Sequence, residues 1–175
     1  MPPSKEQLAR ICFLLSDVDG VLTDGRLVFD SEGNESKVYH VHDSAGFAYW
    51  HRSGFKAGIL SGRNCAAVAH HAKSLGITEV HLGHLDKMPI VQEIAERHSL
   101  ALDEIAYIGD DLLDIPVLQA VGFAASVPNG RQEVLGAAHY VTNASGGRGA
   151  LREVVEHLLR AKDLWEGVVA GGGLS

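Results

Sequence analysis

Short apolar runs alternate along this chain with segments of helical length, and several of the runs end in acidic or small polar residues. Strands that alternate with helices in this way are typical of βαβ units, whose strands form a parallel sheet with helices on both faces. The pattern therefore predicts an α/β fold with a Rossmann-like parallel sheet. We expect strands at residues 11–17, 56–60, 78–82, 104–108, 123–126 and 139–141, and helices at 43–53, 64–75, 86–98, 113–121, 131–135 and 149–162.

A single domain accounts for the length of the chain, because 175 residues lie within the usual domain range and can bury a core. Residues 26–29 and 36–41 flank a turn-rich stretch at 30–34, and this arrangement predicts a β-hairpin. We place the domain at residues 1–166. Residues 167–175 are small and rich in glycine, and we expect them to form a flexible tail.

The charge balance limits the partners. Lysine and arginine number 15 and aspartate and glutamate 22, which gives a net charge of -7 with neutral histidines. Nucleic acid binding needs a basic surface, so we expect no nucleic-acid partner. The apolar run at 11–15 is too short to cross a membrane, and we expect no membrane partner. Cys12 and Cys65 are expected to be buried thiols of a reducing compartment, which predicts a cytoplasmic location.

Four polar clusters each follow an expected strand. In a parallel sheet the carboxyl ends of the strands meet at one edge, where ligands bind, so we expect the clusters to converge. Carboxylates that point at one place repel each other unless a cation relieves them, and such an oxygen-rich set suits Mg²⁺. The clusters are Asp17-Val18-Asp19-Gly20, Ser61-Gly62-Arg63, Lys87, and Gly109-Asp110-Asp111 with Asp114.

Ser61 and Lys87 add the groups that phosphoryl transfer needs. Ser61 and Gly62 lie at the start of an expected helix, where a hydroxyl and backbone N–H groups bind phosphoryl oxygens. Lys87 supplies a positive charge beside the acids, and a carboxylate can act as nucleophile by forming an aspartyl-phosphate. The sequence therefore predicts Mg²⁺-dependent phosphoryl transfer.

The motifs also resemble a known superfamily. The stretch from Asp17 to Gly25 reads Asp-Val-Asp-Gly-Val-Leu-Thr-Asp-Gly and resembles the first motif of the haloacid dehalogenase (HAD) phosphatases. The three later clusters match the second, third and fourth motifs in order. The resemblance implies that Asp17 is the nucleophile, that Asp19 is the general acid and then the base, and that Ser61 and Lys87 bind the phosphoryl group.

The same resemblance implies a metal site. Its Mg²⁺ ligands would be Asp17, the backbone carbonyl of Asp19, and Asp110. Asp111 and Asp114 would lie behind these ligands or orient Lys87. The cofactor that the resemblance predicts is therefore Mg²⁺ alone.

A closer resemblance is to the family of 3-deoxy-D-manno-octulosonate (KDO) 8-phosphate phosphatases. It rests on the Leu-Thr-Asp-Gly end of the first motif, the hairpin, Ser61-Gly62-Arg63, and the run from Gly146 to Glu153. It implies a capless HAD enzyme that acts on a sugar-acid phosphate and forms a homotetramer. In that assembly the hairpins form a central barrel and a neighbouring subunit covers each site. Residues 20–60 leave no room for a lid domain between the first two motifs, so a neighbour is the expected means of excluding water.

The sugar that this resemblance implies stays open between two candidates. KDO 8-phosphate, a precursor of lipopolysaccharide, is favoured, and a nonulosonate 9-phosphate such as KDN 9-phosphate is the alternative, although Arg63 is typically glutamate in that family. Ala48 and His71 stand where relatives often carry arginines, which would pair with the sugar carboxylate. The substrate-binding residues that the resemblance implies are Asp19, His40, His42, Asp43, Ser44, Gly62, Arg63 and Lys87.

Other classes of function fit the sequence less well. A signalling receiver domain also uses a phosphoacceptor aspartate, but its paired metal acids precede that residue, and it would not want an acid at Asp19. A non-catalytic oligomerisation module would be expected to lose Asp19 or Lys87, and both are present. The histidine pairs 40/42 and 81/84 lack the further ligands of a zinc site. The glycines at 146–149 do not form a dinucleotide-binding fingerprint, and we expect them to let backbone approach a subunit interface or a substrate.

Overall fold

The computed structural model describes residues 2–173 and contains one six-stranded sheet in which every strand pair is parallel. The strand order is β5-β4-β1-β6-β7-β8, which confirms the predicted α/β fold with a Rossmann-like sheet. The strands are β1 (Phe13–Ser16), β4 (Lys56–Ser61), β5 (Glu79–Leu82), β6 (Ile105–Ile108), β7 (Phe123–Ser126) and β8 (Tyr140–Val141).

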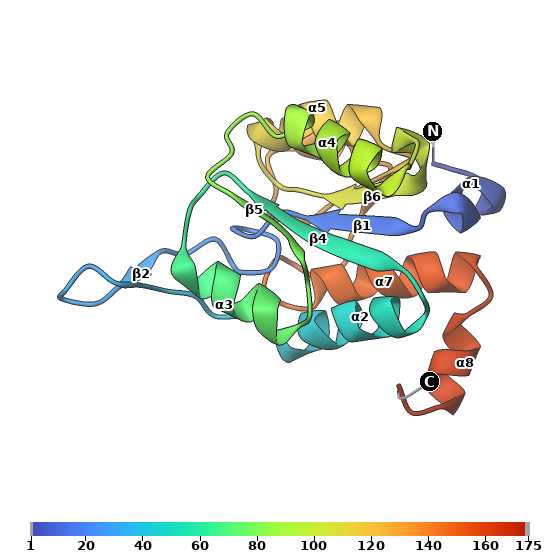
Figure 1. The fold of residues 1–175 in the computed structure, drawn as a ribbon, viewed down its shortest axis with the longest axis horizontal. Helices are drawn as coiled ribbons and strands as arrows, with labels where there is room; N and C mark the ends of the chain where they lie inside the picture. The colour runs from blue at the N-terminus through green and yellow to red at the C-terminus, as the bar shows by residue number, and fades with distance from the viewer. Residues whose placement is uncertain (1, 174–175) are drawn as a thin grey trace.

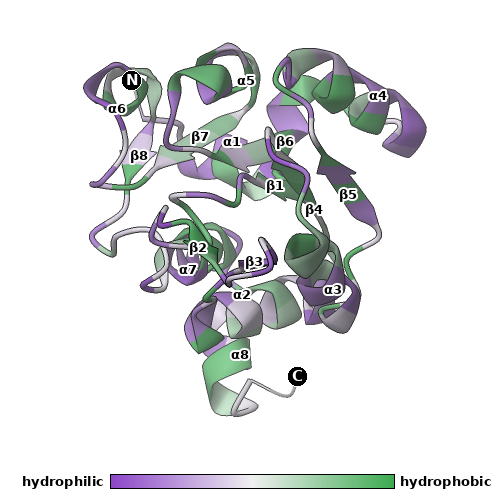
Figure 2. Ribbon diagram, turned by 90° about the vertical axis from the view of Figure 1, so that its left-hand side faces the viewer, coloured by the Kyte–Doolittle hydropathy of each residue, from purple (hydrophilic) through white to green (hydrophobic). Residues whose placement is uncertain are grey.

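Helices cover both faces of the sheet and form three layers with it (Figure 1). Alternate strand residues supply the two cores: Leu14 and Ile59 face the first group of helices, whereas Leu15 and Leu60 face the second. Figure 2 shows the central strands in hydrophobic colours, as expected for a sheet buried on both faces. The first group is α2 (Val41–Arg52), α3 (Ala66–Ser74) and α7 (Ala150–Ala161), and the second is α4 (Met88–His98), α5 (Ile115–Ala120) and α6 (Gln132–Ala137).

The predicted hairpin is present and projects from the body of the molecule (Figure 1). Its strands β2 (Val28–Phe29) and β3 (Glu35–Ser36) pair in antiparallel fashion, and each is shorter than the expected segment. Val28 and Phe29 are 48% and 54% exposed, so the hairpin packs little apolar surface against its own chain. The short ladder follows from this lack of a packing partner.

Four further elements were not predicted from the sequence. Helix α1 begins after Ser4, whose side chain forms a capping box with Gln7. Helix α8 contains the buried side chains of Trp165 and Val168, so the boundary that we placed after residue 166 falls inside a helix. The flexible tail stays a prediction, and its residues 174–175 lie outside the described part of the chain. The four elements are α1 (Lys5–Arg10), η1 (Leu102–Glu104), η2 (Leu112–Asp114) and α8 (Trp165–Ala170).

The position of β1 determines where a ligand can bind. The chain adds β4 and β5 on one side of β1 and then returns to add β6, β7 and β8 on the other. In such sheets the ligand site lies beyond the carboxyl ends of the strands, at the point where the strand order reverses. That point is the end of β1, where Asp17 and Asp19 follow Ser16.

Candidate active site

A cavity of about 130 Å³ opens at the carboxyl ends of β1, β4 and β6. It brings together all four polar clusters that the sequence singled out. Its base is buried, because Asp17, Ser61 and Lys87 are 7%, 1% and 2% exposed. The lining residues are Asp17, Asp19, Ser61, Gly62, Arg63, Lys87, Asp110, Asp111, Leu113 and Asp114.

Lys87 lies between two buried carboxylates. Its Nζ is 3.0 Å from Asp17 Oδ1 and 2.6 Å from Asp114 Oδ1. It also donates to the hydroxyl of Tyr107 at 3.0 Å, and that hydroxyl donates to Asp114 Oδ1 at 2.5 Å. Tyr107 is fully buried in β6, and its role as a support for Lys87 was missed from the sequence. These contacts hold the ammonium group at the base of the cavity.

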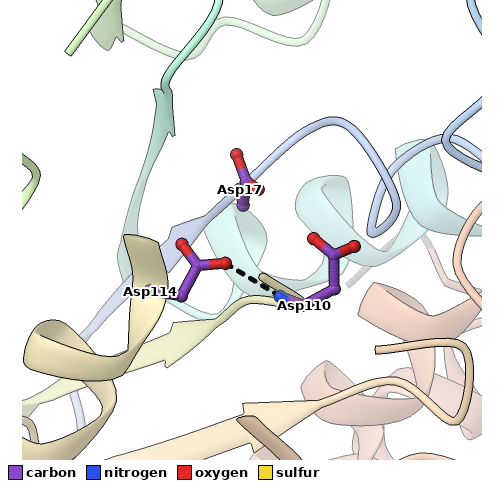
Figure 3. Close-up of side chains that lie close together, drawn as sticks. All are labelled: Asp17, Asp110 and Asp114. Atoms are coloured by element: carbon purple, nitrogen blue, oxygen red, sulfur yellow. Dashed lines mark hydrogen bonds between the residues drawn. The ribbon is translucent and has the colours of Figure 1, made fainter. Parts of the chain in front are cut away.

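Asp114 has donors on both of its oxygens. Besides Lys87 and Tyr107 on Oδ1, the backbone N–H groups of Asp110 and Asp111 donate to Oδ2 at 2.9 and 3.0 Å. Figure 3 shows the bond to the Asp110 nitrogen. The side chain of Asp111 instead accepts from the N–H of Leu112 and caps the short helix η2. Asp114 therefore fixes both Lys87 and the backbone that carries Asp110.

The cavity carries more negative charge than Lys87 neutralises. Burial raises the pKa of Asp17 to about 6, with the charge of Lys87 opposing the shift and that of Asp114 adding to it. Burial also raises the pKa of Asp110 to about 8, and the charges of Asp17, Asp114 and Asp111 act in the same direction. For Lys87, burial alone would lower the pKa, but the charges of Asp17 and Asp114 outweigh it and raise the pKa.

The carboxylates fit a hard divalent cation. One oxygen from each of Asp17, Asp110 and Asp114 lies within 4.8 Å of the other two, and Figure 3 shows the three side chains gathered at one place. Asp110 Oδ1 is buried and has no hydrogen-bond partner in the described chain, whereas both oxygens of Asp114 are used. An oxygen left free among carboxylates is a ligand atom that Mg²⁺ can take.

Two glycines let the loops around the cavity approach each other. Gly20 has φ +91°, and a Cβ atom there would lie 2.0 Å from Asp110 Oδ2. A Cβ atom on Gly146 would lie 1.7 Å from the Gly20 carbonyl oxygen. Asn129 joins the two loops, donating to that oxygen at 2.9 Å and accepting from the Gly146 N–H at 2.7 Å. The glycine run that we expected at an interface or a substrate thus packs against the first motif of its own chain.

Asp19 belongs to a separate ionic network at the mouth of the cavity. Its Oδ1 accepts from Lys37 Nζ, and its Oδ2 lies 3.7 Å from Arg63 Nε. Glu35 accepts from Lys37 at 2.9 Å and from Arg63 at 2.9 Å. Burial alone would lower the pKa of Lys37, but the hydrogen bonds to Asp19 and Glu35 outweigh it and raise the pKa. Glu35 and Lys37 were both missed from the sequence.

The expected sugar-binding segment lies outside this cavity in the single chain. Asp43 is buried, and its carboxylate accepts from the N–H groups of Gly149 at 3.2 Å and Arg152 at 3.0 Å, so it holds the start of α7. His40 caps α2 by accepting from the N–H of His42 at 3.3 Å. Neither these residues nor Ser44 are among the cavity-lining residues.

The two positions where relatives often carry arginine also lie outside the cavity lining. The ring of His71 stacks on Tyr39 with centroids 3.8 Å apart. Ala48 is half-buried on α2. Among the described residues 2–173, Arg63 is therefore the only arginine that lines the cavity of its own chain.

Comparisons with known proteins agree with this geometry. The family model of the haloacid dehalogenase-like hydrolases matches residues 78–152. The chain is 38% identical to the KDO 8-phosphate phosphatase of Yersinia pestis over 93% of its own length and 87% of the relative's. The corresponding Escherichia coli enzyme is 36% identical over 92% of this chain and 87% of the relative. The chain belongs to the KDO 8-phosphate phosphatase family of HAD-like hydrolases.

Solved structures of this family share the whole fold. The phosphatase from Moraxella catarrhalis, in complex with magnesium, phosphate and KDO, superposes with a TM-score of 0.94 at 36% identity, over 96% of this chain and 97% of that one. A cobalt-bound form from Haemophilus influenzae has a TM-score of 0.91 at 32% identity, over 95% and 98% of the two chains. Family membership makes the chain a phosphatase and excludes the receiver and non-catalytic alternatives.

Proposed function

We propose that this chain hydrolyses KDO 8-phosphate to KDO and phosphate in a Mg²⁺-dependent reaction through an aspartyl-phosphate. The observation that carries the proposal is the meeting of buried Asp17 and Lys87 with half-buried Asp110 in one cavity, in a chain that shares its whole fold with a phosphatase bound to magnesium, phosphate and KDO. The alternative, a nonulosonate 9-phosphate, is not favoured, because the relatives named above are KDO 8-phosphate phosphatases.

In the proposed reaction Asp17 is the nucleophile. One of its oxygens attacks phosphorus, the bond from phosphorus to the sugar oxygen breaks, and Asp19 gives a proton to the leaving oxygen. Water then attacks the phosphorus of the aspartyl-phosphate while Asp19 takes a proton from it. Phosphate leaves and the Asp17 carboxylate is restored, so protons and bonds balance over the cycle.

The remaining charged groups hold the phosphoryl group. We assign Lys87 and the hydroxyl of Ser61 to its oxygens, since both line the base of the cavity. Asp17, the Asp19 carbonyl and Asp110 would hold Mg²⁺, and Asp114 would orient Lys87, in line with its full set of donors. When bound, Mg²⁺ supplies positive charge that offsets the phosphoryl oxygens.

Gly62 and Arg63 are assigned to the sugar end of the substrate. Both line the cavity mouth, and Arg63 is exposed enough to move, with 42% of its side chain open to solvent. His40, His42, Asp43 and Ser44 do not line the cavity of their own chain. Their proposed contact with substrate therefore depends on assembly of several subunits.

The assembly that we propose is a homotetramer in which a neighbouring subunit covers each site. Its support is apolar surface on and beside the hairpin: Phe29, Val38 and Val41 are 54%, 74% and 72% exposed. A second copy of the same hairpin is a partner of matching chemistry. Sedimentation of the chain and of a Phe29→Asp variant tests this, and a wild-type monomer would contradict it.

We also propose a cytoplasmic location. The support is that Cys12 and Cys65 are both free, as expected in a reducing compartment. Within residues 2–173, no helix has the length and apolar character that crossing a membrane requires.

Release of phosphate from a panel of substrates tests the proposed function. The panel holds KDO 8-phosphate, KDN 9-phosphate, sialic acid 9-phosphate and a hexose phosphate, each with Mg²⁺ and with excess chelator. We expect KDO 8-phosphate to have the highest kcat/KM and the chelator to remove the activity. A higher kcat/KM for a nonulosonate 9-phosphate would overturn the substrate while leaving the phosphatase chemistry in place.

A further inference from the structure

Lys37 is a buried cation that the proposed reaction does not use. It follows β3 of the hairpin, yet only 1% of its side chain is exposed, because it points back toward the catalytic loop. Its Nζ contacts Asp19 Oδ1 and Glu35 Oε1, the latter at 2.9 Å. It does not line the cavity, so it has no route to substrate in this chain except through Asp19.

The contact leaves the two oxygens of Asp19 unequal. Oδ1 faces the ammonium group of Lys37, which can donate but cannot accept. Oδ2 is buried and has no hydrogen-bond partner among the described residues, and Arg63 Nε lies 3.7 Å from it. Lys37 therefore holds Asp19 through Oδ1, and Oδ2 is the oxygen left without a hydrogen-bond partner.

Glu35 and Arg63 complete a ring of alternating charges around Asp19. Glu35 accepts from Lys37 on Oε1 and from Arg63 on Oε2, each at 2.9 Å. Glu35 and Asp19 have 12% and 18% of their side chains exposed, so their contacts with Lys37 are shielded from water, whereas Arg63 is 42% exposed. The ring ties the orientation of the Asp19 carboxylate to the hairpin.

We propose that Lys37 is a positioning residue that fixes the orientation of the Asp19 carboxylate in the cavity wall, which Asp19 shares with Asp17. This inference rests on the proposed phosphatase mechanism. Lys37 touches neither the phosphoryl group nor the sugar, and it acts only through Asp19. Removal of its charge leaves the carboxylate free to rotate and weakens proton transfer, while the phosphoryl site around Lys87 stays intact.

The test uses two substrates that differ in their need for a proton donor. KDO 8-phosphate has an alcohol leaving group that must be protonated, whereas p-nitrophenyl phosphate has a leaving group that departs without a proton. The variants are Lys37→Met, Lys37→Arg and Glu35→Gln. The matched control is Arg26→Met, which removes a hairpin cation whose ion pair with Asp24 is exposed.

We expect Lys37→Met to lower kcat for KDO 8-phosphate by about 10- to 100-fold, with KM changed by less than about 3-fold. Release of p-nitrophenol in the first turnover should change by less than about 3-fold, since that step needs no proton. Lys37→Arg should recover most of the kcat that Lys37→Met loses. Glu35→Gln should lower kcat for KDO 8-phosphate by about 3- to 10-fold and leave the release of p-nitrophenol nearly unchanged. Arg26→Met should have the kcat of the wild type on both substrates.

Equal losses on both substrates, or no loss on either, would overturn the proposal. If Lys37→Met does not fold, the losses of rate in Glu35→Gln and Lys37→Arg on the two substrates still test the proposal, because unequal losses support it and equal losses overturn it. Failure of the proposed function is a separate result, since it would appear in the wild type as absence of phosphate release from both substrates. If the wild type prefers another sugar phosphate, that substrate replaces KDO 8-phosphate in the comparison.

Discussion

Two charged clusters, one of several carboxylates and one built around the single carboxylate of Glu79, lie at opposite ends of the strands of the sheet. The pKa values of their carboxylates shift in opposite directions. At the carboxyl edge, burial and mutual repulsion raise the pKa of Asp17 to about 6 and that of Asp110 to about 8. At the amino edge, Glu79 is the first residue of β5. Burial alone would raise the pKa of Glu79, but hydrogen bonds from His81, His98 and Arg97 outweigh it and lower the pKa to about 2.

The difference lies in how completely each cluster is paired. Glu79 accepts from His98 at 2.9 Å on one oxygen, and from His81 at 2.9 Å and Arg97 at 2.7 Å on the other. The active-site cluster has Lys87 for several acids and leaves Asp110 Oδ1 without a partner in the described chain. A cluster that its own chain satisfies stabilises the fold, whereas a cluster left with excess charge needs a ligand.

The largest expected effect comes from the nucleophile. Asp17→Asn should lower kcat by at least about 10³-fold, because the aspartyl-phosphate cannot form. The same change removes one charge from the repelling cluster, so thermal unfolding should occur at the same temperature as in the wild type or higher. Phosphate release and calorimetry measure the two effects. Retained turnover, or a large loss of stability, would mean that Asp17, like Glu79, stabilises the fold and is not the nucleophile.

Removal of a cation should have the second largest effect, and the loss of stability should differ between the two clusters. Lys87→Met leaves the buried carboxylates of Asp17 and Asp114 without their cation, and we expect a loss of about 3–5 kcal/mol in the free energy of unfolding together with loss of activity. Arg97→Met is the matched control at the other edge. Half of the Arg97 side chain is exposed (50%), so its loss should cost less than about 1 kcal/mol. Urea unfolding measures the loss of stability in both variants. Similar losses would contradict the proposed difference between the two clusters.

Added Mg²⁺ should stabilise one cluster only. At a free concentration 100 times Kd, a cation that binds the folded chain adds about 2.7 kcal/mol to the free energy of unfolding. Asp110→Asn should abolish the Mg²⁺-dependent rise in unfolding temperature, whereas Glu79→Gln should keep it. A full rise in the Asp110→Asn variant would remove Asp110 from the metal site.

The smallest expected effect concerns Glu79 and depends on pH. The folded pKa of about 2 lies below the reference value of 4.5, so the ionised group stabilises the fold above pH 4.5 and loses that contribution as pH falls toward 2. Glu79→Gln should therefore cost about 1–3 kcal/mol at pH 7 and progressively less below pH 4.5, without a change in kcat. Urea unfolding at several pH values measures this. A constant difference from the wild type would show that Glu79 contributes by packing rather than by charge.

The strands and the chemistry-bearing acids could be predicted from the sequence, because both are encoded locally. Strand β7 occupies the expected residues 123–126, and the acids follow their strands at motif spacing. Tyr107 was missed because its hydroxyl meets Asp114 only once β6 and η2 are packed together. Lys37 was missed for a similar reason, since the hairpin must fold back before it reaches Asp19.

Local signals were also present that the sequence analysis did not use. Ser4 and Gln7 have the spacing of a capping box, which marks the start of α1, although this helix buries only Leu8. Helix α8 was missed because glycines surround it near the end of the chain; its buried side chains are Trp165 and Val168. The sugar contact of Asp43 stays a prediction from its place in a motif, and its hydrogen bonds to the start of α7 appear only in the tertiary structure.

The central claim is that the unsatisfied cluster is a catalytic site with Asp17 as its nucleophile. Acid quenching of the enzyme during turnover of KDO 8-phosphate with Mg²⁺, followed by peptide mass spectrometry, tests it most directly. The account predicts one added phosphoryl group on the peptide that contains Asp17, absent when Mg²⁺ is chelated and absent in Asp17→Asn. Steady turnover with no phosphoryl group on that peptide, or with the group on another residue, would contradict it.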